Sequence, residues 1–306
     1  MIAHQLTLIR REVWEHPAIW VTPVVIALIL SLLTLTGQVS VSTIGDGKAL
    51  DLAIVGAQNV GAEQRSAVLT AVLFGVTSVF AVGAWIIIVF YCLDALYAER
   101  KDKSILFWRS LPITDSATVL SKLLTALCVI PLVTLLIAMA AHLLIMVLFG
   151  IWVAVQGGDA LHLIWGSARL ADLWGACVVL ALALPLWLSP FIGWFLFVSA
   201  FTKRSPLLTA FLPLLVLPML ENLVHSNLFF NAIFVRSVQP PIAEFARFGQ
   251  LEQHIAAGAT AETFSLMEQI ALADFLLSPS LWAGIVVCGL LTAAAVYVRR
   301  YRDESY

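Results

Sequence analysis

Six long stretches with almost no charge dominate this sequence. They cover residues 17–36, 66–93, 123–155, 173–202, 206–225 and 279–298, and the only Asp, Glu, Lys or Arg within them is Glu221. A bilayer core of about 30 Å is crossed by roughly 20 apolar residues in a helix. Only helices and closed barrels satisfy their backbone groups in lipid, and runs this long without alternation are helical. The sequence therefore predicts an all-α integral membrane protein with six transmembrane helices.

The composition agrees with this class of protein. Hydrophobic residues make up 61% of the 306 and charged residues 12%, whereas a soluble domain has about a quarter charged residues. The net charge of -2 provides no basic footprint, so we expect no nucleic-acid partner. The expected environment is the lipid bilayer.

The distribution of Lys and Arg predicts the orientation. Twelve of the 17 lie in short segments beside the spans: residues 10–11, 100–122, 203–204 and 299–302. The other five are spread over longer loops, and the positive-inside rule places the denser set in the cytoplasm. Both termini are then cytoplasmic, in a multi-pass protein of the plasma membrane, such as a bacterial inner membrane.

Several local signals refine the spans. Ser205-Pro206 and Ser278-Pro279 resemble an N-cap followed by a first-turn proline, and Thr114 or Asp115 can cap the third span. Internal prolines are expected to kink the helices without breaking them, because neighbouring helices can satisfy the released carbonyls. They are Pro131, Pro185, Pro190, Pro213 and Pro218.

Residues 1–16 precede the first span, and residues 17–306 form the six-span domain. Ile2, Leu6, Ile9 and Val13 share one helical face, whereas Glu12 lies elsewhere. This pattern favours an interfacial helix on the inner membrane surface over a frayed tail.

The predicted cytoplasmic loop 94–122 is the most informative stretch. A charge cluster at 99–103 is followed by a short apolar segment that ends at Pro112. A loop in water has no reason to display Trp, Phe and Leu together unless the membrane surface or a partner's groove covers them.

With this loop, the chain resembles the permease family of type-two ATP-binding-cassette (ABC) exporters. The resemblance rests on the N-terminal interfacial helix, the six spans, the acid-plus-base cluster after the second span, the Leu111-Pro112 step and Lys122 at the start of the third span. Many members have glycine where this chain has Lys103 or Ser104. The resemblance implies that the loop is a coupling helix that inserts into an ATPase subunit. Carried over by position, its residues are Glu99, Arg100, Ile105, Leu106, Trp108, Arg109, Leu111 and Pro112. Of these, Trp108 is expected to fill the cleft, with Glu99 and Arg109 as charges at its rim.

The resemblance also implies a pathway lined by spans two and five. Apolar candidates there suit a hydrophobic or amphipathic substrate, although they could equally face lipid: Phe80, Trp85, Phe90 and Phe211. Glu221 is either a pathway acid or the point where the fifth helix leaves the bilayer, and the second reading is favoured. The outer segment 222–278 suggests two amphipathic helices, around 242–255 and 260–275, which either cap the exit or rest on the membrane.

No catalytic or metal-binding motif accompanies these features. Gly45-Asp-Gly-Lys48 fails as a phosphate loop because Ser42 replaces its first glycine and Ala49 its hydroxyl residue. We therefore expect no enzyme activity, cofactor or metal in this chain, with ATP and Mg²⁺ bound by a partner subunit. His142 and His225 as haem ligands are a weak alternative, and the four cysteines all lie within predicted spans.

The leading hypothesis is thus a permease subunit of an ABC exporter. It would pair with a second copy or a paralogue and with two cytoplasmic ATPase subunits, and work by alternating access. An ion-coupled secondary transporter and a non-transporting membrane assembly factor are the alternatives.

Overall fold

The computed structural model describes residues 2–35, 62–110, 113–155, 157–221, 230–238, 265–268 and 270–301. Helices account for almost all of these residues, and no β-strand occurs among them. The elements are α1 (Ile2–Glu15), α2 (Ala18–Leu35), α4 (Ala62–Ala95), α5 (Tyr97–Lys101), α6 (Ser104–Ser110), α7 (Asp115–Leu124), η2 (Thr125–Val129), α8 (Ile130–Val155), η3 (Leu161–Trp165), α9 (Leu170–Trp187), α10 (Ser189–Phe201), α11 (Pro206–Glu221), η5 (Asn231–Val235), α13 (Arg236–Val238), α16 (Leu272–Leu277) and α17 (Pro279–Tyr301).

Within the described ranges, four helical stretches are long and apolar enough to cross a membrane. They are Val68–Lys101, Asp115–Val155, Leu170–Trp187 and Pro279–Tyr301. A fifth crossing is possible if α1 and α2, which meet at a bend of 53°, are one span. The class predicted from the sequence, an all-helical chain with several apolar helices, is confirmed.

The predicted fourth span, 173–202, is wrong as a single helix. The chain forms α9 up to Trp187 and a separate α10 from Ser189, with Leu188 between them. Pro190 lies in the first turn of α10, where its missing N–H costs nothing, so it begins a helix here instead of kinking one. By contrast, Pro185 in α9 and Pro213 in α11 lie inside continuous helices, as expected.

The predicted fifth span is shorter than a typical span. Helix α11 has 16 residues, which at 1.5 Å each reach about 24 Å, less than the hydrocarbon core of about 30 Å. Helix α10, with 13 residues, is shorter still. The apolar sequences of α10 and α11 suit the membrane interior. Both helices are, however, shorter than the four that are long enough for a full crossing.

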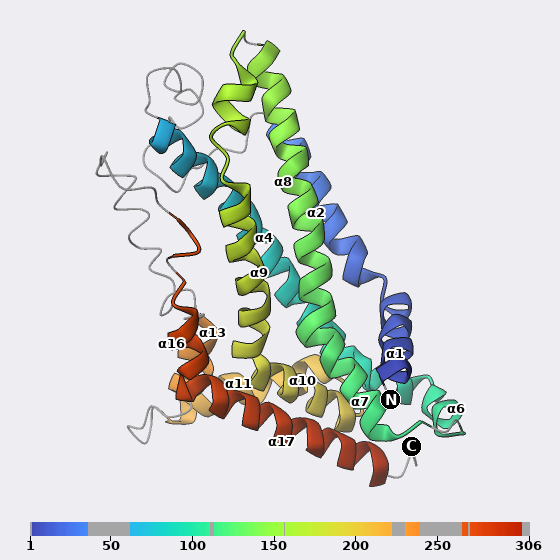
Figure 1. Ribbon diagram of the computed structural model, residues 1–306. Helices are drawn as coiled ribbons and strands as arrows, with labels where there is room; N and C mark the ends of the chain where they lie inside the picture. The colour runs from blue at the N-terminus through green and yellow to red at the C-terminus, as the bar shows by residue number, and fades with distance from the viewer. Residues whose placement is uncertain are drawn as a thin grey trace.

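The helices α2, α4, α8 and α9 run as long rods toward one end of the molecule (Figure 1). Helices α10, α11 and α17 lie across the opposite end, with α10 packed against both α17 and α4. The main apolar core forms where Ile88 and Cys92 of α4 meet Ile192 and Leu196 of α10. The first residues of α1 and the last of α17 lie near α6 at that same end (Figure 1).

Helix α1 forms over the predicted residues. Of the predicted apolar face, Leu6 is exposed and Ile9 and Val13 are half-buried. Leu8 and Glu12, one turn apart, are buried against the rest of the protein. Burial of Glu12 brings it into the site described next, and the placement of α1 on the membrane surface stays a prediction.

Candidate functional site at the α6 end

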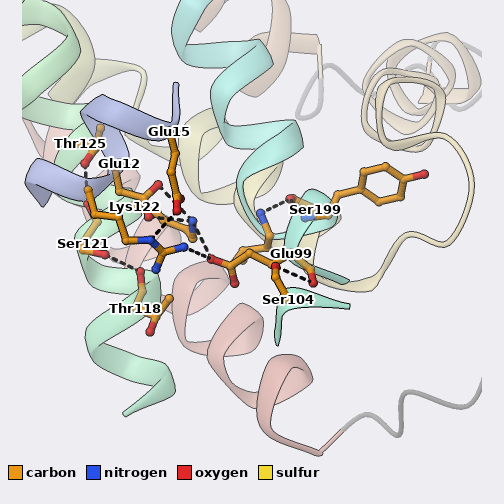
Figure 2. Close-up of polar contacts among 12 residues, drawn as sticks. Glu12, Glu15, Glu99, Ser104, Thr118, Ser121, Lys122, Thr125 and Ser199 are labelled. Atoms are coloured by element: carbon orange, nitrogen blue, oxygen red, sulfur yellow. Dashed lines mark hydrogen bonds and ion pairs between the residues drawn. The ribbon is translucent and has the colours of Figure 1, made fainter. Parts of the chain in front are cut away.

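Four buried charges from four helices meet where α1, α5, α7 and α17 converge. We call Glu12, Glu99, Lys122 and Arg299 the ion cluster. Lys122 Nζ lies 2.9 Å and 3.1 Å from the two carboxylate oxygens of Glu12, and 3.0 Å from Oε1 of Glu99. The other oxygen of Glu99 accepts a hydrogen bond of 2.5 Å from Nη1 of Arg299. Figure 2 shows Lys122 between the two acids.

The ion cluster is balanced in charge and almost dry. Two carboxylates face two cations, and Lys122 and Glu12 are each only 1% exposed. Buried ions are tolerated when they are paired and further hydrogen-bonded. Glu12 also accepts a hydrogen bond of 2.8 Å from the hydroxyl of Tyr91, which connects it to α4.

A second layer of charges surrounds the ion cluster. Asp115, in the first turn of α7, accepts a 2.9 Å hydrogen bond from Nε of Arg299. Arg11 lies 3.7 Å from Glu99 and donates a 2.7 Å hydrogen bond to Glu15, which is half-exposed. Through Arg11 and Asp115, these contacts connect the buried charges to partly exposed side chains.

Helix α5 is also fastened on its other side, to α10. Arg100 Nη2 donates to the carbonyl oxygens of Ser199 and Thr202, at 2.6 Å and 2.8 Å. The Ser199 hydroxyl in turn accepts from the backbone N–H groups of Leu96 and Tyr97, both at 3.0 Å. Glu99 and Arg100, adjacent in the sequence, thus tie α5 to opposite neighbours.

A tight turn connects α5 to α6. Lys103 has φ of 57°, in the left-handed region that favours glycine. The turn directs α6 away from the bundle immediately after the anchored α5.

Helix α6 presents an apolar side chain outward. Ile105 is buried, whereas Phe107 is 60% exposed. Trp108 is partly buried: the Arg11 guanidinium lies 3.3 Å above its ring, and Phe107 packs edge-on against it with centroids 5.1 Å apart. The side chain available to a partner is therefore Phe107 more than Trp108, and Glu99 is buried instead of lying at a rim. The side chains of Leu106 and Arg109, with Leu111 and Pro112, lie outside the described residues.

The four aromatic residues of the predicted pathway do not form one group. Phe80 is buried in a cluster with Val76 and Ala138, and Phe90 is exposed on the surface of α4. Trp85 and Phe211 do lie near one another, because both pack on Phe195 of α10, with ring centroids at 6.4 Å and 5.6 Å.

Glu221, the remaining pathway candidate, is buried at the last position of α11 and accepts a 2.8 Å hydrogen bond from the backbone N–H of Phe230. This contact agrees with the structural reading of Glu221, in which it ends the helix. The predicted outer helix 242–255 lies outside the described residues. In the predicted helix 260–275, the described part has a turn at 266–268 and becomes helical only at α16.

The outer segment is nevertheless anchored to α9. The Asp172 carboxylate, in the first turn of α9, accepts hydrogen bonds from Ser265 Oγ at 2.5 Å and from the N–H groups of Leu266 and Met267 at 2.7 Å and 3.2 Å. Leu266 is fully buried beside them. One carboxylate thus fixes the chain shortly before α16.

Among the described residues, no three His, Cys, Asp or Glu side chains lie together as metal ligands do. The sequence does not predict the ion cluster: Arg299 stands out there only as a charge beside the last span, and Glu12 only as a polar position in residues 1–16. The available signal is Lys122, which directly precedes the apolar run 123–155, where a charge is costly without a partner.

No protein-family model, no curated protein and no solved structure matches this chain. The inference of function therefore depends on the residues themselves: the apolar helices, the ion cluster and the outward face of α6.

Proposed function

We propose that this chain is the transmembrane permease subunit of an ABC exporter, and that α6 is the element that receives force from a partner ATPase. The chain would have six spans, with α9 and α10 together as the fourth and α11 as the fifth. The chain would lie in the plasma membrane, and the α6 end would face the cytoplasm. A second copy or a paralogue would complete the pathway, and ATP and Mg²⁺ would bind in the ATPase.

The observation that carries the proposal is the contrast between α5 and α6. Helix α5 is held by buried ion pairs to α7 and α17 and by carbonyl contacts to α10. Helix α6, directly after it, exposes Phe107 at the end where basic residues are dense. A short helix that follows an anchored helix and exposes an aromatic side chain suits insertion into a groove on a partner. Covering the ring would contribute roughly 1.5–3 kcal/mol of burial.

The proposed substrate is hydrophobic or amphipathic, as the apolar helices suggest. Trp85, Phe195 and Phe211 form an aromatic group within the core between α4, α10 and α11. Alternating access would have to separate these helices for a substrate to reach the group.

The test is copurification of the ATPase with this chain. Phe107→Ala should reduce the amount of ATPase recovered per permease and the associated ATP hydrolysis, while membrane insertion stays normal. Trp108→Ala should have a weaker effect on association, because Arg11 already covers its ring. The matched control is Val155→Ala, which truncates a side chain that is 79% exposed at the other end of the molecule. If Phe107→Ala and Val155→Ala both retain wild-type ATPase, α6 is not the docking element.

A further inference from the structure

Helix α1 carries two adjacent arginines that have different surroundings. Arg11 lies 3.7 Å from Glu99 and donates a hydrogen bond to Glu15, so its charge is balanced within the protein. Arg10 is exposed, and its guanidinium carbon lies 4.9 Å from the centroid of the Trp14 ring. None of the ion pairs among the described residues includes Arg10. Arg10 therefore presents a positive charge outward that no described acid balances.

Arg10 lies within an exposed apolar face of α1. Leu6, Arg10 and Trp14 follow one another at intervals of four residues, so they share one side of the helix. Leu6 and Trp14 are both exposed. An exposed face that combines Leu and Trp with a basic residue is typical of helices that lie in the headgroup region of a bilayer.

The exposed side of α2 begins where α1 ends. The two helices meet at a bend of 53°, and Figure 1 shows α1 continuing from the lower end of α2. Exposed apolar side chains follow α2 at intervals of four residues: Trp20, Val24, Leu28 and Leu32. In a chain that crosses a membrane, such a stripe contacts acyl chains. Trp14 and Trp20 lie on either side of the bend, and tryptophan is enriched at the membrane–water interface. The bend therefore marks the depth of the headgroups, with Arg10 beyond it.

A phosphate is the ligand that best matches Arg10 at this depth. The cation–π contact with Trp14 orders the guanidinium without giving its N–H groups an oxygen acceptor. Guanidinium N–H groups form a planar fork that fits two oxygens of a phosphate. In a zwitterionic lipid the phosphate already has a cation beside it, whereas an anionic lipid carries an uncompensated charge that attracts basic residues to the membrane surface.

We propose that Arg10, held over Trp14, binds the phosphate of an anionic phospholipid, such as phosphatidylglycerol, whose acyl chains lie along the exposed face of α2. The site requires only that the chain lies in a bilayer and does not depend on the proposed function. Glu12 is buried on the other side of α1, so the lipid would hold in place the helix that supplies one acid of the ion cluster.

The experiment uses the purified full chain in lipid nanodiscs made of phosphatidylcholine and phosphatidylglycerol in equal amounts. A fluorophore is attached at Leu6→Cys, one turn from Arg10, in a Cys128→Ser background because the other three cysteines are buried. A nitroxide quencher is placed near the top of the acyl chain, on phosphatidylglycerol in one preparation and on phosphatidylcholine in the other. The ratio of the two quenching efficiencies measures the preference of this site for the anionic lipid.

The wild-type side chains should give stronger quenching by phosphatidylglycerol. Arg10→Gln should reduce the preference about fivefold, the change expected for one basic residue at an anionic membrane surface. Arg10→Lys keeps the charge but not the planar fork, so it should retain part of the preference. The matched control is Arg300→Gln, which removes an exposed arginine that lies over Tyr301 at the same end of the molecule. This control should leave the quenching ratio at Leu6 unchanged.

Three results would overturn the site. Equal quenching by the two lipids in the protein with Arg10 present would show that the face has no preference for an anionic lipid. An equal loss in Arg10→Gln and Arg300→Gln would show general charge attraction instead of a site at Arg10. Loss of the preference on adding millimolar soluble glycerol phosphate would show that the arginine takes free phosphate and not a lipid. Because no ATPase is present, the outcome is independent of the test of the proposed function.

Discussion

At the scale of single residues, the ion cluster balances two buried carboxylates, Glu12 and Glu99, against two buried cations. The charges of Glu12, Glu99, Lys122 and Arg299 are plain in the sequence, but their pairing depends on how α1 and α17 dock, which no local pattern encodes. The Thr114 cap could be predicted, because its hydroxyl needs only the N–H of Ala117, three residues away. Local hydrogen bonds are readable from sequence, whereas long-range ion pairs are not.

Lys122→Met should be strongly destabilising. It leaves two buried carboxylates, Glu12 and Glu99, without their shared cation, and breaking a buried pair from one side costs about 3–5 kcal/mol. The matched control, Glu15→Gln, removes an i,i+4 pair at the surface and should change stability by about 0.5 kcal/mol or less. Thermal unfolding in nanodiscs measures both; equal midpoints for the two variants would refute the structural role given to the ion cluster.

Lys103→Gly should not destabilise the protein, in contrast to Lys122→Met. A non-glycine residue in the left-handed region carries a steric cost of about 1 kcal/mol, which glycine does not. The variant should therefore unfold at the same or a higher temperature than wild type. Lys101→Gly, two residues earlier in helical α5, should unfold at a lower one, because glycine in a helix costs about 1 kcal/mol. Destabilisation of both variants to the same degree would show that the turn at Lys103 is not strained.

At the scale of elements, apolar runs predicted the helices well and their interruptions poorly. The predicted spans 17–36, 66–93 and 279–298 correspond to α2, α4 and α17 within a few residues. The run 173–202 has no charged residue at the point where the helix breaks. Nothing in the sequence distinguishes Pro185, which lies inside a helix, from Pro190, which lies at the start of one. Which proline kinks a helix and which begins one depends on the neighbours that satisfy the released carbonyls, such as Arg236 at Trp187.

The contact of α10 with α17 provides an element-scale prediction. Gly193→Ala places a methyl group against the Cys288 backbone, which cannot rotate away, so α10 and α17 must separate and stability should fall by about 1–3 kcal/mol. Gly289→Ala, in the same helix α17, meets no atom within 4 Å and should be neutral or stabilising by up to about 1 kcal/mol. The difference between their thermal midpoints checks the packing; a Gly193→Ala variant as stable as Gly289→Ala would contradict the close approach.

At the scale of the whole molecule, the segments predicted to be cytoplasmic gather at one end. Helices α1, α5, α6 and α7 and the last turn of α17 meet there, joined by the ion cluster (Figures 1 and 2). The distribution of Lys and Arg predicts this grouping, because the positive-inside rule depends only on the residues that flank the spans. The number of full crossings could not be predicted with the same success, since α10 and α11 are too short to settle it by length.

Topology reporters address the crossings directly. A reporter active only outside the cell should be active after Gly157 or Gly258 and silent after Lys103 or Tyr306, because the dense positive charges stay inside. A fusion after Lys203, between α10 and α11, should also be silent if α9 and α10 form one crossing. Activity at Lys203 would mean that α10 crosses separately, and activity at Lys103 would reverse the orientation.

The most direct test of the proposed transport role is site-specific crosslinking in living cells. A photo-reactive phenylalanine at Phe107 should crosslink to an ATPase of the ABC class, identified by mass spectrometry, because this exposed ring lies on α6, directly after the anchored α5. The same group at Val155, exposed at the opposite end, should not. A Phe107 position that crosslinks only to lipid, or that gives the same products as Val155, would contradict the account of this chain as the permease partner of an ATPase.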